Sequence, residues 1–292
     1  MNTYIVFQSY GAPALLDECK FALLRLYRML GDQTPQVVVY TDQPHEFEPF
    51  AAIVPLTIRE MNAQLISQWK GQHQFVHRVK IEVIKDCLAG RQGKLIYMDS
   101  DTCVTSALPD LLERISAAQV VFHIPEGKIG AGGNLHFRKW KQFLQSAPNP
   151  ALQFPDPLHI EMWNAGVIGL HNSHLPLLDE VLALTDELYP LFPRHTVEQF
   201  AFCYTFQKNN IHISEAADIV FHYWNLKEFR ILLGRFFTQH AAVPLQELAA
   251  LTDSIQPQPI VNDKMQFEQL PFFKKIIQKA KGNTWSINRY YV

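Results

Sequence analysis

Residues 1–100 alternate between short apolar runs and longer segments in which apolar residues recur every three or four positions. The short runs predict β-strands and the periodic segments predict amphipathic helices, an alternation typical of parallel β-α-β units. The expected strands here are 3–10, 36–42, 51–57 and 94–98, and the expected helices are 15–30 and 74–88. The sequence therefore predicts an α/β fold with a Rossmann-like, mixed but mostly parallel central sheet flanked by helices.

The rest of the chain adds fewer strands and ends in a helical region. The expected elements are strands 117–125, 165–171 and 218–223, helices 176–188 and 197–206, and further helices to the end. Two intervals are expected to be loops because of their turn-forming residues, namely Gly127, Gly130, Gly132 and Gly133 in one and Pro148, Pro150, Pro155 and Pro157 in the other.

Composition narrows the class of protein. Hydrophobic residues make up 48% of the 292 positions, which is enough for a sizeable core. The formal net charge of -2 shows no basic excess, so nucleic acid is not an expected partner. The four cysteines form no Cys-x-x-Cys pattern and are expected to be reduced and packed. Neither a signal peptide nor an apolar run of about 18 residues is present, so we expect a cytoplasmic protein.

Two aspartates end the apolar run 94–98. Residues two apart on a strand project to the same side, so Asp99 and Asp101 lie together while Ser100 points away. Their like charges repel unless a cation lies between them, and carboxylate oxygens suit Mg²⁺ or Mn²⁺. Ligands bind beyond the carboxyl ends of parallel strands, which is where this pair falls. An ordinary turn or helix cap remains the alternative.

A lysine interrupts the apolar face of the predicted helix 74–88. Lys80 lies within the apolar arc, whereas Arg78 and Lys85 lie on the opposite side. An unpaired ammonium is costly there. Either Lys80 extends its head group to solvent, or it binds a phosphate or balances the acidic pair.

Four segments, in order along the chain, resemble the core of GT-A-fold glycosyltransferases, in particular glycosyltransferase family 8 and its relatives. They are LIYMDSDTCV, EMWNAGVIGLH, HTVEQFAFCYTF and DIVFHYWNLKEF. The likeness runs from the first strand to about Phe229. It implies a nucleotide-sugar-binding GT-A catalytic domain over 1–229, followed by a helical C-terminal extension over 230–292 packed on the same domain.

The resemblance implies a metal site. In that family an Asp-x-Asp and a later histidine hold a manganese ion that bridges the diphosphate of a nucleotide sugar. Carried over, the ligands of Mn²⁺ (or Mg²⁺) are Asp99, Asp101 and His222. Without the two aspartates, a lone histidine after a short apolar strand is more often a satisfied core or edge residue than a metal ligand.

The resemblance also implies sugar-facing and donor-binding residues. Asn164 matches a segment near the donor sugar, and Glu198 with Gln199 matches an acidic-Gln pair that faces the reacting sugar. These three are the catalytic candidates, and the donor-binding candidates are Lys80, Ser100 and Lys227. From the residues alone, Asn164 could equally be a turn or helix-capping residue. Glu198 and Gln199 are also typical of the first turn of a helix.

The match departs from the family pattern after the histidine. The family has His-aromatic-x-Gly-x-x-Lys-Pro-Trp, whereas this chain has HYWNLKEF. Asn225 stands for the glycine, Lys227 comes one position early, and Glu228 and Phe229 stand for Pro-Trp. The departure indicates a divergent branch and leaves the phosphate role of Lys227 open.

The activity implied is transfer of a sugar, by a hexosyltransferase-like enzyme, from a nucleotide-diphosphate sugar, most readily a UDP-sugar, to an acceptor hydroxyl with retention of configuration. The acceptor is a saccharide, a lipid-linked molecule or a protein. One alternative is a sugar-phosphate nucleotidyltransferase, whose glycine-rich signature after the first strand is not supplied by SYGAPALL. Another is a catalytically silent protein that binds a nucleotide sugar.

The C-terminal segment LPFFKKIIQKAKGN combines aromatic and aliphatic residues with lysines. Such a segment can rest on an anionic membrane, which would place the protein at the inner face of a membrane through a weak peripheral contact. The alternative is an ordinary amphipathic helix that packs on the body of the protein.

Overall fold

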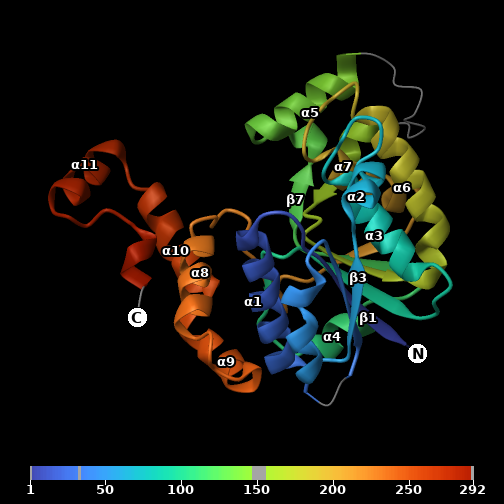
Figure 1. Ribbon diagram of the computed structural model, residues 1–292. Helices are drawn as coiled ribbons and strands as arrows, with labels where there is room; N and C mark the ends of the chain where they lie inside the picture. The colour runs from blue at the N-terminus through green and yellow to red at the C-terminus, as the bar shows by residue number, and fades with distance from the viewer. Residues whose placement is uncertain (1, 32–33, 147–155, 291–292) are drawn as a thin grey trace.

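The computed structural model of the chain describes residues 2–31, 34–146 and 156–290. A seven-stranded sheet runs through the centre, in the order β10-β6-β9-β4-β1-β2-β3 (Figure 1). β9 is antiparallel to β4 and β6, and the other neighbours are parallel. The strands are β1 Thr3–Gln8, β2 Gln36–Thr41, β3 Leu56–Glu60, β4 Lys94–Met98, β6 Gln119–Phe122, β9 Val167–His171 and β10 His212–Glu215. The predicted mixed, mostly parallel sheet is confirmed.

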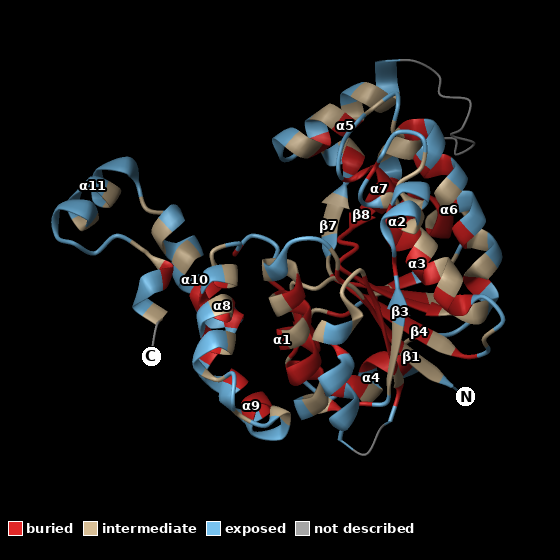
Figure 2. Cartoon of the chain, viewed as in Figure 1, coloured by how far each residue is buried: buried red, intermediate tan, exposed pale blue. Residues whose placement is uncertain are grey.

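The inner strands of the sheet, such as β2, β4 and β9, are buried on both faces because they are apolar at nearly every position. Ile5 and Phe7 pack into one core while Val6, between them, packs into the other. Helix α1 covers the first face, with α8 and α9 packed on its outer side, and α3, α6 and α7 cover the second face (Figures 1 and 2). Their bounds are α1 Pro13–Met29, α3 Arg78–Leu88, α6 Leu175–Leu188, α7 Val197–Lys208, α8 Phe229–Gln239 and α9 Leu245–Leu251.

Two small antiparallel ladders lie at the carboxyl end of β4. β5 (Thr102–Val104) pairs with β11 (Val220–His222), and β7 (Pro125–Lys128) pairs with β8 (Glu161–Trp163). Segments far apart in sequence therefore meet just beyond the acidic pair.

Some expected boundaries are wrong. The strand expected at 51–57 begins at Leu56, because Glu48–Ala52 forms a 3-10 turn and Pro55 has no N–H to donate to a ladder. The helix expected from Gln74 begins at Arg78, since Gln74 has a left-handed backbone with φ 51°. Gly127 lies in β7 instead of a loop. Pro148, Pro150 and Pro155 fall outside the described residues.

The C-terminal helices differ in how they pack. α8 and α9 pack against α1, whereas α11 (Phe272–Ala280), which follows α10 (Pro257–Glu268), contains no buried residue. Within the described ranges, no helix is long and apolar enough to cross a bilayer. The four cysteines are buried and free, as predicted.

Candidate active site

The acidic pair is held at the end of β4 by backbone hydrogen bonds to two later segments. The Asp99 N–H donates to the carbonyl of Gly166 (2.8 Å), and the Asp101 carbonyl accepts from the N–H of Tyr223 (3.0 Å). The β5–β11 ladder sets His222 opposite Thr102. Chain segments more than 50 residues apart are thereby brought to one point.

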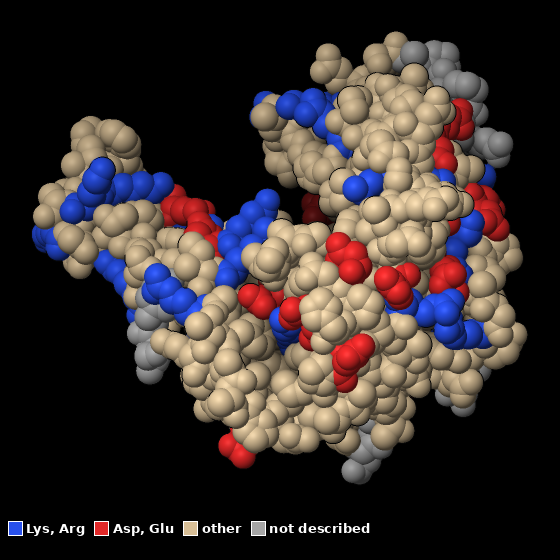
Figure 3. Space-filling model, in the orientation of Figure 1, with Lys and Arg blue, Asp and Glu red and all other residues tan. Residues whose placement is uncertain are grey.

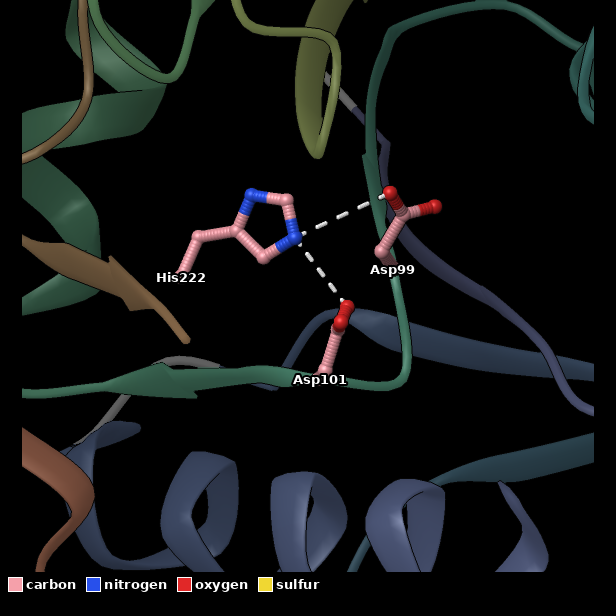
Figure 4. Close-up of side chains that lie close together, drawn as sticks. All are labelled: Asp99, Asp101 and His222. Carbon is pink, nitrogen blue, oxygen red and sulfur yellow. Dashed lines mark hydrogen bonds and ion pairs between the residues drawn. The ribbon is translucent and has the colours of Figure 1, made fainter. Parts of the chain in front are cut away.

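Asp99, Asp101 and His222 form a cluster, called here the metal-ligand cluster (Figure 4). Nε2 of His222 lies 3.1 Å from Oδ1 of Asp101 and 4.0 Å from Oδ2 of Asp99. One ligand atom from each residue lies within 4.8 Å of the others. Two carboxylates and an imidazole are a donor set that suits Mn²⁺ or Mg²⁺, so these residues fit a divalent ion.

The charge of the cluster is also suited to a cation. Burial by itself would raise the pKa of Asp101, but the charge and hydrogen bond of His222 outweigh burial, and the pKa is lowered. The carboxylate is therefore ionised at neutral pH. The side chains of Asp99 and Asp101 keep 27% and 22% of their exposure, against 6% for His222, so the cluster is reachable from the acidic side.

Gly166 is required beneath the histidine. A Cβ at this position would lie 2.1 Å from the imidazole ring of His222, much closer than any real contact. The glycine of the sequence segment WNAGV therefore serves a close approach between β9 and the ring.

Asn164 fixes how the ring of His222 is protonated. Its Oδ1 accepts a hydrogen bond from the N–H of Gly166 (3.0 Å) and lies 2.9 Å from Nδ1 of His222. Its Nδ2 donates to Oε1 of Glu126 (3.1 Å), which orients the amide with oxygen toward the ring. An amide oxygen only accepts, so Nδ1 carries the proton and donates. The hydrogen bond between Nε2 and Asp101 belongs to the protonated ring, with an N–H on both nitrogens. In the neutral imidazole that a metal ion would require, the lone pair is on Nε2, the atom that faces the two aspartates.

Glu126 is the functional candidate that the sequence analysis missed. Its second oxygen accepts from Nε2 of Gln199 (2.8 Å), so a single carboxylate on β7 holds both Asn164 and Gln199. Glu126 therefore binds the amide nitrogen of Gln199 and leaves its amide oxygen unbound by Glu126. The only signal in the sequence is an acidic residue soon after an apolar run, which is too common to single out.

Lys80 meets anions and does not extend to solvent. Its Nζ donates to the Ala165 carbonyl (2.9 Å) and lies 3.2 Å from the carboxylates of Asp99 and Glu198. The contact with Glu198 is an ion pair and not a well-aligned hydrogen bond, since Glu198 Oε1 has no hydrogen-bond partner among the described residues. Burial alone would lower the pKa of Lys80, but Asp99 and Glu198 raise it, so the ammonium stays charged.

Glu198 is almost completely buried beside this ammonium. Burial raises the pKa of Glu198 to about 7, although Lys80 acts to lower it, and the negative charge of Asp99 raises it further. Burial and the neighbouring charge of Asp99 therefore favour the protonated form of Glu198 up to near neutrality. The hydroxyl of Tyr97 also holds the Asp99 side chain, because it donates a hydrogen bond to Oδ1 (2.9 Å).

Ser100 and Lys227 are not drawn into this network. Ser100 is half-buried and Lys227 is exposed, and neither side chain makes a hydrogen bond or ion pair with another described residue. A different cation lies nearby: Nε of Arg230 donates to Oε1 of the buried Glu18 (2.8 Å). Burial raises the pKa of Glu18 to about 7 despite this partner. The negative charge of Asp101 acts to raise the pKa of both Glu18 and Arg230. This agrees with the packing of α1, which carries Glu18, against β5.

The surface around these residues is concave. Figure 3 shows a hollow between the surface over α5 (Leu135–Ser146) and the surface over α8 and α10, with acidic atoms deep inside it.

No protein-family model matches the sequence, and no curated protein does. Among solved structures, the crystal structure of mouse xyloside xylosyltransferase 1 in its apo form shares the fold, with a TM-score of 0.52 and 12% identity. The match covers 74% of this chain and 85% of that chain. That protein is a GT-A-type glycosyltransferase, so the predicted GT-A fold class is confirmed. At this identity the likeness concerns the fold alone, and membership of glycosyltransferase family 8 stays a prediction.

Proposed function

We propose that the protein is a metal-dependent glycosyltransferase that moves a hexose from a nucleotide-diphosphate sugar, a UDP-sugar, to an acceptor hydroxyl with retention of configuration. The observation that carries the proposal is the metal-ligand cluster, in which Asp99, Asp101 and His222 converge at the carboxyl end of β4. In an open α/β sheet this is where ligands bind. The GT-A fold supports the same conclusion.

The metal-ligand cluster would hold Mn²⁺ or Mg²⁺ at the donor diphosphate. When bound, such an ion neutralises charge that develops on the leaving diphosphate. Asn164 keeps the proton of His222 on Nδ1, and Tyr97 and Lys80 keep the Asp99 carboxylate in place. Lys80 already donates hydrogen bonds to Asp99 and to the carbonyl of Ala165 and forms an ion pair with Glu198, so we propose that it acts through Asp99 and not directly on the phosphates.

Asn164, Glu198 and Gln199 are proposed to face the donor sugar. All three are buried, and Glu126 and Lys80 hold them through side-chain contacts. Ser100 and Lys227 remain proposed contacts to the donor because their polar groups are not engaged elsewhere in the described chain. Acceptors compatible with this proposal are saccharide, lipid-linked or protein hydroxyls.

Calorimetric titration with UDP and Mn²⁺ tests the proposal. Wild type should bind UDP only with the metal, and the Asp99→Ala, Asp101→Ala variant should lose at least about a hundredfold in affinity, as expected when metal ligands are removed. The matched control is Asp110→Ala, Glu113→Ala, which removes two exposed carboxylates on α4 (Leu108–Glu113) and should bind as wild type does. If both variants bound UDP with Mn²⁺ equally well, the assignment of Asp99 and Asp101 as metal ligands would be wrong.

A donor panel then separates the reactions. Transfer or slow hydrolysis of a UDP-sugar supports a glycosyltransferase. Pyrophosphate released from a nucleoside triphosphate and a sugar phosphate would indicate a nucleotidyltransferase instead. Metal-dependent UDP binding with neither reaction, across the whole panel, would indicate a silent binding protein.

A further inference from the structure

Helix α11 stands away from the rest of the molecule, beyond α10 at one outer end (Figure 1). None of its residues is buried, and Figure 2 shows it pale blue and tan throughout. Its large apolar side chains are exposed to 72% at Phe272, 78% at Phe273, 49% at Ile276 and 52% at Ile277. Four large apolar residues gathered on one short helix make a patch of a kind that folded proteins rarely leave uncovered.

The apolar and basic residues of α11 lie on opposite sides. With about 100° between successive helical residues, Phe272, Phe273, Ile276, Ile277 and Ala280 fall on one continuous arc. Lys274, Lys275 and Lys279 fall on the other, and Lys281 follows at the C-cap. Basic atoms gather over this helix in Figure 3.

The exposure of α11 is not that of a loose chain end, because the chain returns to the body after it. Ile287 is 6% exposed and belongs to the core over α1 and α8. The hydroxyl of Tyr290 donates to Asp263 (2.6 Å), and Lys264 lies over the ring of Trp285 (5.4 Å). α11 is thus a projection anchored to α10 and to the core by the segments on either side.

The positive charge of α11 indicates which kind of partner would cover its apolar arc. The sequence contains no Asp or Glu between Gln269 and Val292, so the charged side chains of α11 itself are all positive. A second copy of the chain docked through the same arc would bring two sets of lysines together, which is unfavourable. An anionic bilayer instead offers phosphates to the lysines and acyl chains to the aromatic and aliphatic side chains.

We propose that α11 is a docking surface for an anionic phospholipid bilayer, with its apolar arc in the interface and its lysines at the head groups. Membrane binding through α11 needs neither metal nor nucleotide. It can therefore be tested independently of the proposed glycosyl transfer. It would hold the enzyme at a surface where lipid-linked acceptors are concentrated.

Co-sedimentation of the full-length protein with lipid vesicles tests the proposal. Wild type should pellet with phosphatidylcholine vesicles that contain phosphatidylglycerol and stay in solution with phosphatidylcholine alone. The Phe272→Ser, Phe273→Ser variant should lose at least about tenfold in partitioning. Lys274→Gln and Lys279→Gln should each cost about fivefold.

The matched control is Leu135→Ser, Leu191→Ser, which removes two leucines that are similarly exposed at 60% and 61% but lie elsewhere. It should partition as wild type does. Wild type that remains in the supernatant with anionic vesicles, or equal losses in the phenylalanine and leucine variants, would overturn the proposal. A change of oligomeric state in lipid-free solution on replacing the phenylalanines would overturn it in favour of a second copy as the occupant.

Discussion

The surroundings of the metal-ligand cluster and the helix α11 depart in opposite ways from the usual placement of side chains. At the cluster, charged groups are buried: Lys80 is 5% exposed and Glu198 is 2% exposed. At α11, phenylalanines are exposed. The buried charges already have partners within the protein, whereas the exposed rings have none that would cover them. The first region is organised before any ligand arrives, and the second is complete only when something outside the chain covers it.

The largest effect is expected from breaking the buried charge network. Lys80→Met removes the cation shared by Asp99 and Glu198 and should lower the free energy of unfolding by about 3–5 kcal/mol at about pH 9, above the pKa of about 7 of Glu198, since the ionised Glu198 is then left as an uncompensated buried charge. Urea unfolding measures it. Adding Glu198→Gln should restore part of the loss. If Lys80→Met were as stable as wild type, the buried charge network would not contribute to the free energy of unfolding.

The next effect is on metal affinity. In Glu126→Gln, one side-chain amide replaces a carboxylate that accepts from both Asn164 and Gln199, so one of these hydrogen bonds must be lost. Mn²⁺ affinity, followed by calorimetry, should fall about tenfold to a hundredfold. The control is Glu161→Gln on the neighbouring strand β8, where Gln207 binds the backbone and not the carboxylate. Equal losses in both would exclude a specific role for Glu126.

A smaller effect is expected in the pH dependence of stability. Burial raises the pKa of Glu18 to about 7 in the folded state, above its ordinary value of 4.5. The folded state therefore holds an extra proton between these values, and stability falls as pH rises through this window by up to about 1.4 kcal/mol per pH unit. Glu18→Gln should reduce this slope in urea unfolding but not abolish it, because Glu198, whose pKa burial also raises to about 7, titrates in the same window. Glu113→Gln, at an exposed carboxylate, should leave the slope unchanged. A slope that Glu18→Gln leaves intact would assign the titration to another group.

The smallest effect belongs to α11. Because Phe272 and Phe273 are exposed, replacing both with serine should change the free energy of unfolding by no more than about 0.5 kcal/mol. Thermal unfolding without lipid checks this. A loss of several kcal/mol would mean that the rings are covered in solution, and the contrast between the two regions would then disappear.

Much of the fold could be predicted from local pattern. Apolar runs such as 94–98 identify strands buried on both faces, and the position of Asp99 and Asp101 at the end of one follows from the order of residues. Errors fell where a single residue redirects the backbone, as at Gln74 and Pro55. The placement of Lys80 on an apolar arc predicted an unusual environment but left open which anion it meets.

The sequence by itself determined which residues are apolar, where strands and helices recur, and that two carboxylates emerge together at a strand end, because these properties depend on neighbours a few positions away. Only the tertiary structure decided that Glu126 joins Asn164 to Gln199, that Gly166 lies against His222, and that α11 is left uncovered. His222 and Asp101 are 121 residues apart in the chain and 3.1 Å apart in space. Such contacts depend on how layers pack against one another, which the periodicity of a single segment does not encode.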